Sequence, residues 1–118
     1  MDIVRYLKFG EKYFREGEGL LAEGQLTQAS EKFWGAVAES IKAVAESRGW
    51  SHARHRHLSV AIARLYEEAK DPEIPRLYAS AESLHANFYE GFAPESMVKL
   101  YYEDAKRLIG KLKALVKL

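Results

Sequence analysis

The residues of this sequence best suited to chemistry are histidines and arginines. One stretch, RGWSHARHRH (48–57), holds three arginines, three histidines and no acidic residue. Histidine ordinarily gains and loses a proton near neutral pH, which suits it to general acid–base chemistry. The arginine guanidinium offers phosphate a planar fork of donors. Together these residue types are suited to a contact with phosphate.

His55 lies between Arg54 and Arg56, near the expected start of a helix. Free backbone N–H groups at a helix N-terminus attract an anion, and two basic side chains add to this attraction. One interpretation is therefore a phosphate contact made by these three residues, with His55 as a candidate catalytic residue. The other is a half-buried histidine that hydrogen-bonds to a helix end. Both remain open, and His52 and His57 are expected in solvent.

A second candidate is the histidine of the stretch AESLHANFYEGF (81–92). On a helical wheel His85 lies at the border of the buried stripe, beside Tyr78 and Tyr89 and one turn from Glu82. His85 is thus a candidate catalytic residue with three candidate binding residues around it. The alternative is a border histidine that hydrogen-bonds to a neighbour and fixes helix packing.

Length and composition limit the class of protein. The chain has 118 residues, and we expect residues 1–118 to form one domain. The absence of cysteine excludes a disulfide framework, a cysteine nucleophile and a thiolate metal site. The net charge of +1 does not by itself indicate nucleic acid. No signal peptide or membrane-spanning segment is evident, so we expect a cytoplasmic protein without membrane contact.

We expect neither a metal nor a cofactor. His52, His55 and His57 lack the i, i+4 spacing of a helical zinc site, and no acidic residue lies close to them in sequence. The glycines of FGEKYFREGEGLLAEG (9–24) occur in a helical frame without a preceding strand. This context does not match a glycine-rich phosphate loop.

Apolar residues recur with the period of a helix along almost the whole chain, and no segment alternates like a strand. The fold class is therefore all-α. The short links predict a single antiparallel up-and-down bundle of about five helices. We place these helices at residues 2–23, 26–48, 52–70, 73–90 and 94–117.

The helix ends have local signals. Gly49 suits the left-handed position after the second helix, with Trp50 folding back on it. Ser51 is a candidate N-cap for the third helix. Asp71 and Pro72 suit the cap and the first position of the fourth helix.

The same periodicity predicts which side chains face inward. The second helix has the widest stripe, built on Phe33, Trp34, Val37, Ala38, Ile41 and Val44. The third helix has Leu58, Ile62 and Leu65. The fourth has Leu77, Ala81, Leu84 and Phe88, with Asn87 about 160° from His85 on the wheel. The fifth has Met97, Leu100, Tyr101, Leu108, Leu112 and Leu115.

Three stretches together, QASEKFWGAVAESIKAVAESRGW (28–50), HRHLSVA (55–61) and AESLHANFYEGF (81–92), resemble the archaeal PaREP family. The resemblance runs from about residue 5 to residue 110, in order and with matching spacing. This family consists of small helical proteins similar to HEPN domains. The resemblance therefore implies a HEPN-like bundle, often a homodimer.

The resemblance also implies a range of functions. Many HEPN proteins are metal-independent ribonucleases of toxin or defence systems, some pair with a small nucleotidyltransferase, and others bind RNA or assemble without catalysis. The catalytic members carry an Arg, four to six residues and then a His. Cleavage beside a ribose 2′-hydroxyl needs such a base, and an Arg stabilises the charge of the pentavalent transition state.

Neither Arg–His pair of this sequence fits that pattern. Arg76 and His85 have eight residues between them, which places their side chains on opposite sides of one helix. Arg48 and His55 have six residues between them, but the expected helix end at Gly49 interrupts the spacing. The sequence therefore contains no confirmed catalytic pair.

Two functions of different classes follow. The first is a HEPN-like module associated with RNA or a nucleotide. The second is a non-enzymatic homodimeric interaction protein, including a partner of a nucleotidyltransferase, because an aromatic content of 12% exceeds what one small core must hide. A third, small-molecule binding, would need His55 and His85 to converge.

Overall fold

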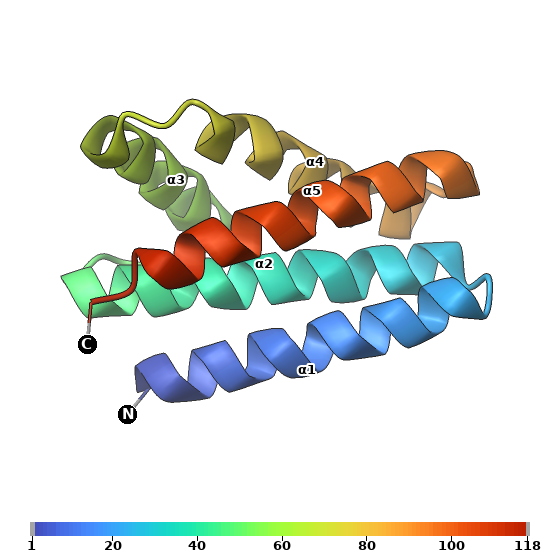
Figure 1. Cartoon of the computed structure of the whole chain (residues 1–118), viewed down its shortest axis with the longest axis horizontal. Coiled ribbons are helices and arrows are strands. Elements are labelled where there is room, and N and C mark those ends of the chain that lie inside the picture. Colours follow the sequence, from blue (N-terminus) through green and yellow to red (C-terminus); the bar gives the residue numbers. More distant parts are fainter. Residues whose placement is uncertain (1, 118) are drawn as a thin grey trace.

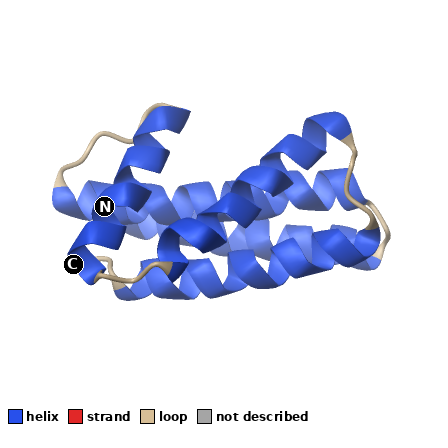
Figure 2. Ribbon diagram, turned by 90° about the horizontal axis from the view of Figure 1, so that it is seen from above, coloured by secondary structure: helices blue, strands red, loops and turns tan. Residues whose placement is uncertain are grey.

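The helical periodicity of the sequence is realised in five helices. A computed structural model describes residues 2–117. Its elements are α1 (Asp2–Ala22), α2 (Leu26–Arg48), α3 (His55–Ala69), α4 (Glu73–Glu90) and α5 (Glu95–Ala114). The expected all-α bundle is confirmed, and residues 2–117 contain no strand. Figure 2 shows the connecting loops at the two ends of the molecule.

The central element is α2, which contacts each of the other four helices (Figure 1). Its predicted stripe is correct, because every member of that stripe is buried. The large side chains that are fully buried, from α2 and its neighbours, include Phe33, Val37, Ile41, Val44, Leu65, Ile74, Leu84, Val98, Leu108 and Leu112. A helix that is apolar on so much of its circumference requires neighbours on several sides.

The end of α2 follows its sequence signal. Gly49 is left-handed, with φ of 73°, and the Trp50 N–H donates to the Ala45 carbonyl at 2.9 Å. This is the pairing of a Schellman motif, which satisfies carbonyls that the helix leaves free. Trp50 is partly buried against the core, as expected.

The start of α3 differs from the prediction. The helix begins at His55 rather than at residue 52, so Ser51 does not cap it. His52, expected in solvent, is only 18% exposed and its Nε2 lies 2.8 Å from Glu46 Oε1. His57 is also engaged, because its Nδ1 accepts the Arg54 N–H at 3.2 Å. Histidine is not a usual capping residue, so this cap was invisible in the sequence.

Three side chains predicted to face inward are exposed. Phe88 is 39% exposed, and α3 begins beside Glu82, before the last turn of α4. In α5, Met97 and Leu100 are 36% and 66% exposed. The helix has apolar residues on more than one side, and the buried stripe proves to be Val98, Ala105, Leu108 and Leu112.

Charged residues tie the start of α4 to α5. Asp71 accepts the Glu73 N–H at 3.0 Å, but α4 begins at Glu73 and its N-cap position is Pro72, one residue later than the predicted cap. Glu73 pairs with Arg107 at 2.7 Å and with Lys111 at 3.0 Å, and Lys111 also pairs with Asp71. Hydrogen bonds from Arg107 and then Lys111 lower the pKa of Glu73 to about 2.

Within residues 2–117, no helix has both the length and the apolar character needed to cross a membrane.

We predict that Gly17→Ala destabilises the protein. A Cβ at Gly17 would lie 2.6 Å from the Phe33 ring, so α1 and α2 would have to move apart. Overpacking of this kind costs about 1–3 kcal/mol and outweighs a helix-propensity gain of up to about 1 kcal/mol. Gly19→Ala is the matched control, because no atom lies within 4 Å of its Cβ position. Urea unfolding should show opposite signs for the two variants, and equal signs would contradict this packing.

A second prediction concerns acid unfolding. A carboxyl whose pKa is lowered on folding stabilises the protein above its ordinary value, near 4.5 for Glu73, and this contribution disappears as the pH falls toward about 2. The stability difference between the wild type and Glu73→Gln should therefore be largest near neutral pH and vanish at about pH 2. Thermal unfolding across this range measures it. Glu67→Gln, an exposed change on α3, should show no such trend.

Candidate functional site

The structure brings His55 and His85 together. His55 is the first residue of α3 and His85 lies in the second half of α4. Their ring centroids are 5.5 Å apart, with the planes at 72°. Residues thirty positions apart in the sequence thus form one cluster, which meets the condition for a shared site.

Each histidine is held by a carboxylate. His55 Nε2 lies 2.8 Å from Glu82 Oε1, and His85 Nδ1 lies 2.9 Å from Glu31 Oε1. The second ring nitrogen of each, His55 Nδ1 and His85 Nε2, has no hydrogen-bond partner among residues 2–117. A carboxylate on one nitrogen orients the imidazole and leaves the other nitrogen accessible to a ligand.

Trp34 of α2 supports both histidines from the core side. It is 8% exposed, and its ring stacks on His85 at 4.8 Å and is tilted against His55 at 5.0 Å. We call His55, His85, Glu31, Glu82 and Trp34 the histidine site. Three helices contribute to it, and its rings are fixed by packing on a buried aromatic side chain.

The antiparallel pairing of α3 and α4 places His55. Besides the contact with Glu82, Ser59 Oγ lies 3.2 Å from the Tyr78 hydroxyl, one turn further along both helices. Tyr78 is 7% exposed, and burial raises its pKa to about 12. Tyr78 is therefore a neutral hydroxyl behind the site, and it supports Trp34 with a ring separation of 6.1 Å.

The rim of the site is aromatic on one side. Tyr89 is 71% exposed and sits edge-on to His85 at 5.4 Å. Phe88 contacts Tyr89 at 4.9 Å. An exposed ring beside two imidazoles gives this rim a flat apolar surface suited to stacking.

Two arginines adjoin His55 in the chain. Arg54 and Arg56 flank His55 and are exposed. No described acidic side chain forms an ion pair with either guanidinium, so both are available to an anion. The half-exposed His55 lies between them, with 47% of its side chain accessible.

Arg48 and Arg76, the arginines of the two Arg–His pairs considered in the sequence, lie outside the histidine site. Arg48 is 6% exposed, pairs with Glu68 and donates to the Leu115 carbonyl, so it joins the ends of α2, α3 and α5. Its guanidinium is committed to the fold. Arg76 is exposed near the start of α4, more than two turns from His85. Neither arginine belongs to the histidine site.

Asn87 has a structural role. It is fully buried, donates to Ser30 Oγ at 3.0 Å and accepts the Ala93 N–H at 2.8 Å. Ser30 in turn donates to the Leu26 carbonyl. This network joins the end of α4 to the start of α2, and it explains why an amide stands so close to His85.

Sequence reasoning missed Glu31 and Trp34 as members of the site. Trp34 was placed in the core stripe, which is correct, but its ring also carries both histidines. Glu31 precedes Trp34 by three residues and so lies on the same side of α2. That spacing was the only available signal for Glu31. The contact between Glu31 and His85 becomes visible only in the packing of α4 on α2. Among residues 2–117, no group of acidic and histidine side chains is arranged to hold a metal ion.

The fold and this cluster define a small all-helical protein with a histidine site on its surface. The model of the archaeal PaREP1/PaREP8 family matches residues 5–109, so the chain belongs to that family. The resemblance found in the three sequence stretches is thereby confirmed. The likeness to HEPN domains stays a prediction.

One solved structure supports the fold closely. A crystal structure of a protein from Sulfolobus solfataricus superposes with a TM-score of 0.82 at 29% sequence identity. The match covers 92% of this chain and 97% of that chain. No curated protein matches. Function is therefore inferred from the chemistry of the histidine site.

We predict that Asn87→Ala destabilises the protein, because Asn87 has a structural role and is not part of the histidine site. The change leaves the buried Ala93 N–H without an acceptor, which costs about 1–3 kcal/mol. Glu90→Ala, at an exposed position of the same helix, should change stability by less than about 0.5 kcal/mol. Chemical denaturation measures both, and an Asn87→Ala variant as stable as Glu90→Ala would contradict the assigned network.

Proposed function

We propose that this protein is an RNA-associated module that binds single-stranded RNA at the histidine site. The observation that carries the proposal is the pair of Glu-bound imidazoles, 5.5 Å apart. The exposed Tyr89 contacts one of them, and exposed arginines precede and follow the other in the chain. Each part would contact one part of a nucleotide: the arginines the phosphate, the imidazoles the ribose hydroxyl, and the tyrosine the base.

Arg54 and Arg56 would bind phosphate oxygens, because the guanidinium fork matches their geometry. Tyr89, 71% exposed, would stack on a base, an interaction worth about 1–3 kcal/mol and tolerant of sequence. His55 adjoins both arginines in the chain, and His85, which it contacts, lies against Tyr89. A strand bound by the arginines and by Tyr89 would pass close to both imidazoles.

The chemistry that such a pair supports is cleavage of the strand without a metal. One imidazole takes the proton of the ribose 2′-hydroxyl, and the 2′-oxygen attacks phosphorus. The bond from phosphorus to the 5′-oxygen breaks, and the second imidazole protonates that leaving oxygen. The products are a 2′,3′-cyclic phosphate and a 5′-hydroxyl. A HEPN-like module with this reaction would suit a toxin or defence system, where RNA is the target.

RNA binding is tested with a fluorescent single-stranded RNA of mixed sequence. Arg54→Ala with Arg56→Ala should weaken binding, and the slope of log affinity against log salt should fall by about 0.7 for each phosphate that the protein no longer neutralises. Tyr89→Ala should weaken binding by about tenfold or more, with little change in the salt slope. Arg76→Ala is the matched control, because it removes an exposed arginine of α4 outside the site. Absence of binding at low salt would overturn the proposal.

Cleavage has its own readout. If the site cleaves RNA, the product carries a cyclic phosphate, and His55→Gln or His85→Gln abolishes it while RNA binding persists. Binding without product leaves the module as a non-catalytic RNA binder.

A second candidate is a homodimeric interaction protein, including a partner of a small nucleotidyltransferase. The observation that favours it is exposed apolar surface, above all Leu100, which is 66% exposed on α5. Large exposed apolar side chains near one another mark interaction surfaces. This surface lies on helices that contribute nothing to the histidine site, so the two functions are compatible.

A further inference from the structure

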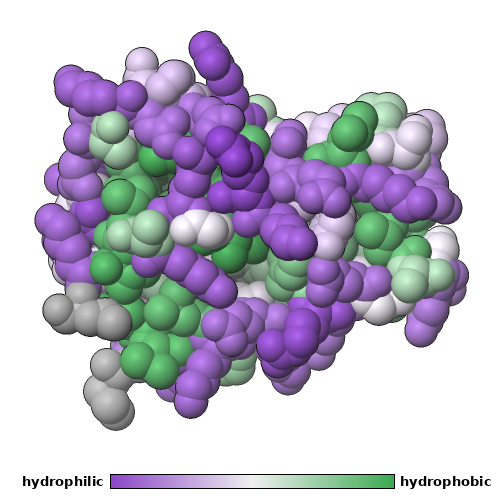
Figure 3. Space-filling view, in the orientation of Figure 1, coloured by the Kyte–Doolittle hydropathy of each residue, from purple (hydrophilic) through white to green (hydrophobic). Residues whose placement is uncertain are grey.

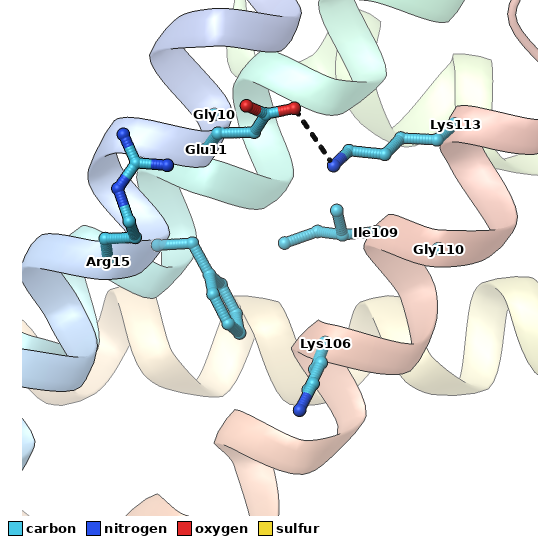
Figure 4. A pocket seen from close by; sticks show the side chains of 8 residues that line it. Gly10, Glu11, Arg15, Lys106, Ile109, Gly110 and Lys113 are labelled. Carbon is cyan, nitrogen blue, oxygen red and sulfur yellow. Dashed lines mark hydrogen bonds and ion pairs between the residues drawn. The ribbon is translucent and has the colours of Figure 1, made fainter.

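A long furrow separates α1 from α5. Both helices pack on α2, but their backbones stay apart, and they meet through the stacked rings of Phe14 and Tyr102 at 5.4 Å. Near the C-terminal end of α5 the furrow holds a hollow of about 300 Å³ with Phe14 and Ile109 in its floor (Figure 4). We call the surface formed by α1, α5 and this furrow the α1/α5 face.

The furrow continues toward the start of α5. There a second hollow, of about 510 Å³, is lined by Leu21, Leu100 and Tyr102. Figure 3 looks onto the molecule in the orientation of Figure 1 and shows hydrophobic residues at the surface among hydrophilic ones, notably beside the two chain ends. Apolar side chains therefore line the furrow at both ends.

Charge is polarised along this face. At one end the hollow is lined by three basic side chains, Arg15, Lys106 and Lys113, and by one acidic side chain, Glu11. Figure 4 shows Glu11 and Lys113 bridging across the hollow, with Arg15 and Lys106 on its rim. At the other end the charged lining is mainly acidic. It consists of Glu18, Glu23, Glu95 and Glu103, together with Lys99, which pairs with Glu95 at 2.8 Å. The antiparallel course of α1 and α5 brings like charges together at each end.

We infer that the α1/α5 face binds a second copy of itself around a two-fold axis perpendicular to the furrow. This inference rests on the homodimer proposed above and adds its surface and its geometry. A two-fold interface uses the same patch on both subunits. The rotation places the basic end of each copy on the acidic end of the other.

The charge pattern of the α1/α5 face favours a second copy of the protein over other binding partners. A small amphiphilic anion, or a helix of uniform negative charge, would match the basic end but be repelled by Glu23 and Glu103. A second copy matches both ends at once.

The test uses two charge-reversed variants. Arg15→Glu with Lys106→Glu makes both ends of the face acidic, and Glu23→Lys with Glu103→Lys makes both ends basic. All four side chains are exposed, and no described residue forms an ion pair with them, so each variant should fold. Circular dichroism and thermal unfolding check this before sedimentation analysis.

The expected result has three parts. The wild type is a dimer that weakens with salt, each variant alone is a monomer, and an equimolar mixture of the two variants forms a heterodimer. Leu100→Ser, which keeps the charges, should also weaken the dimer. These measurements do not depend on RNA, so they are independent of the histidine site.

Different failures have different meanings. A wild-type protein that stays monomeric at high concentration would overturn both the homodimer and its surface. Variants that remain dimeric would overturn the α1/α5 face while keeping the homodimer. Monomeric variants that do not associate when mixed would overturn the two-fold geometry.

Discussion

Burial of α2 on most of its circumference is the constraint on which the structure depends. Its apolar side chains need partners on several sides, so the other four helices are arranged around it. α1 can approach α2 closely because the residue that faces Phe33, Gly17, has no side chain. On another side, Glu31 and Trp34 lie where α3 and α4 cover α2, and this placement creates the histidine site. The same burial that stabilises the core thus sets the position of the chemistry.

The polar groups around α4 separate into two kinds. Asn87 is fully buried, and its amide is used by Ser30 and by the backbone of Ala93, so it stabilises the junction of α4 and α2. His55 and His85 are partly exposed, and each keeps one ring nitrogen without a partner among the described residues. A satisfied buried amide specifies packing, whereas an oriented, accessible imidazole is available for a ligand.

The proposed functions use separate parts of the molecule. The histidine site belongs to α2, α3 and α4, whereas the α1/α5 face belongs to α1 and α5. Assembly through the latter uses none of the residues of the former. Membership of the archaeal PaREP1/PaREP8 family and the similar fold of the Sulfolobus solfataricus protein support the architecture. They do not assign a reaction or a ligand, so the proposed chemistry rests on the residues of the histidine site.

Local patterns in the sequence determined most of the fold. Apolar periodicity placed all five helices to within three residues at each end, and the glycine at position 49 marked a real helix end. These features depend only on residues close together in the sequence, so they can be predicted from the sequence alone. The sequence also indicated the individual histidines. It did not indicate that Phe88 is exposed or that the His57 side chain caps α3. The pairing of His55 with Glu82, of His85 with Glu31, and of both with Trp34 was decided by tertiary structure alone, because each contact joins different helices whose spacing and rotation only the packed core sets.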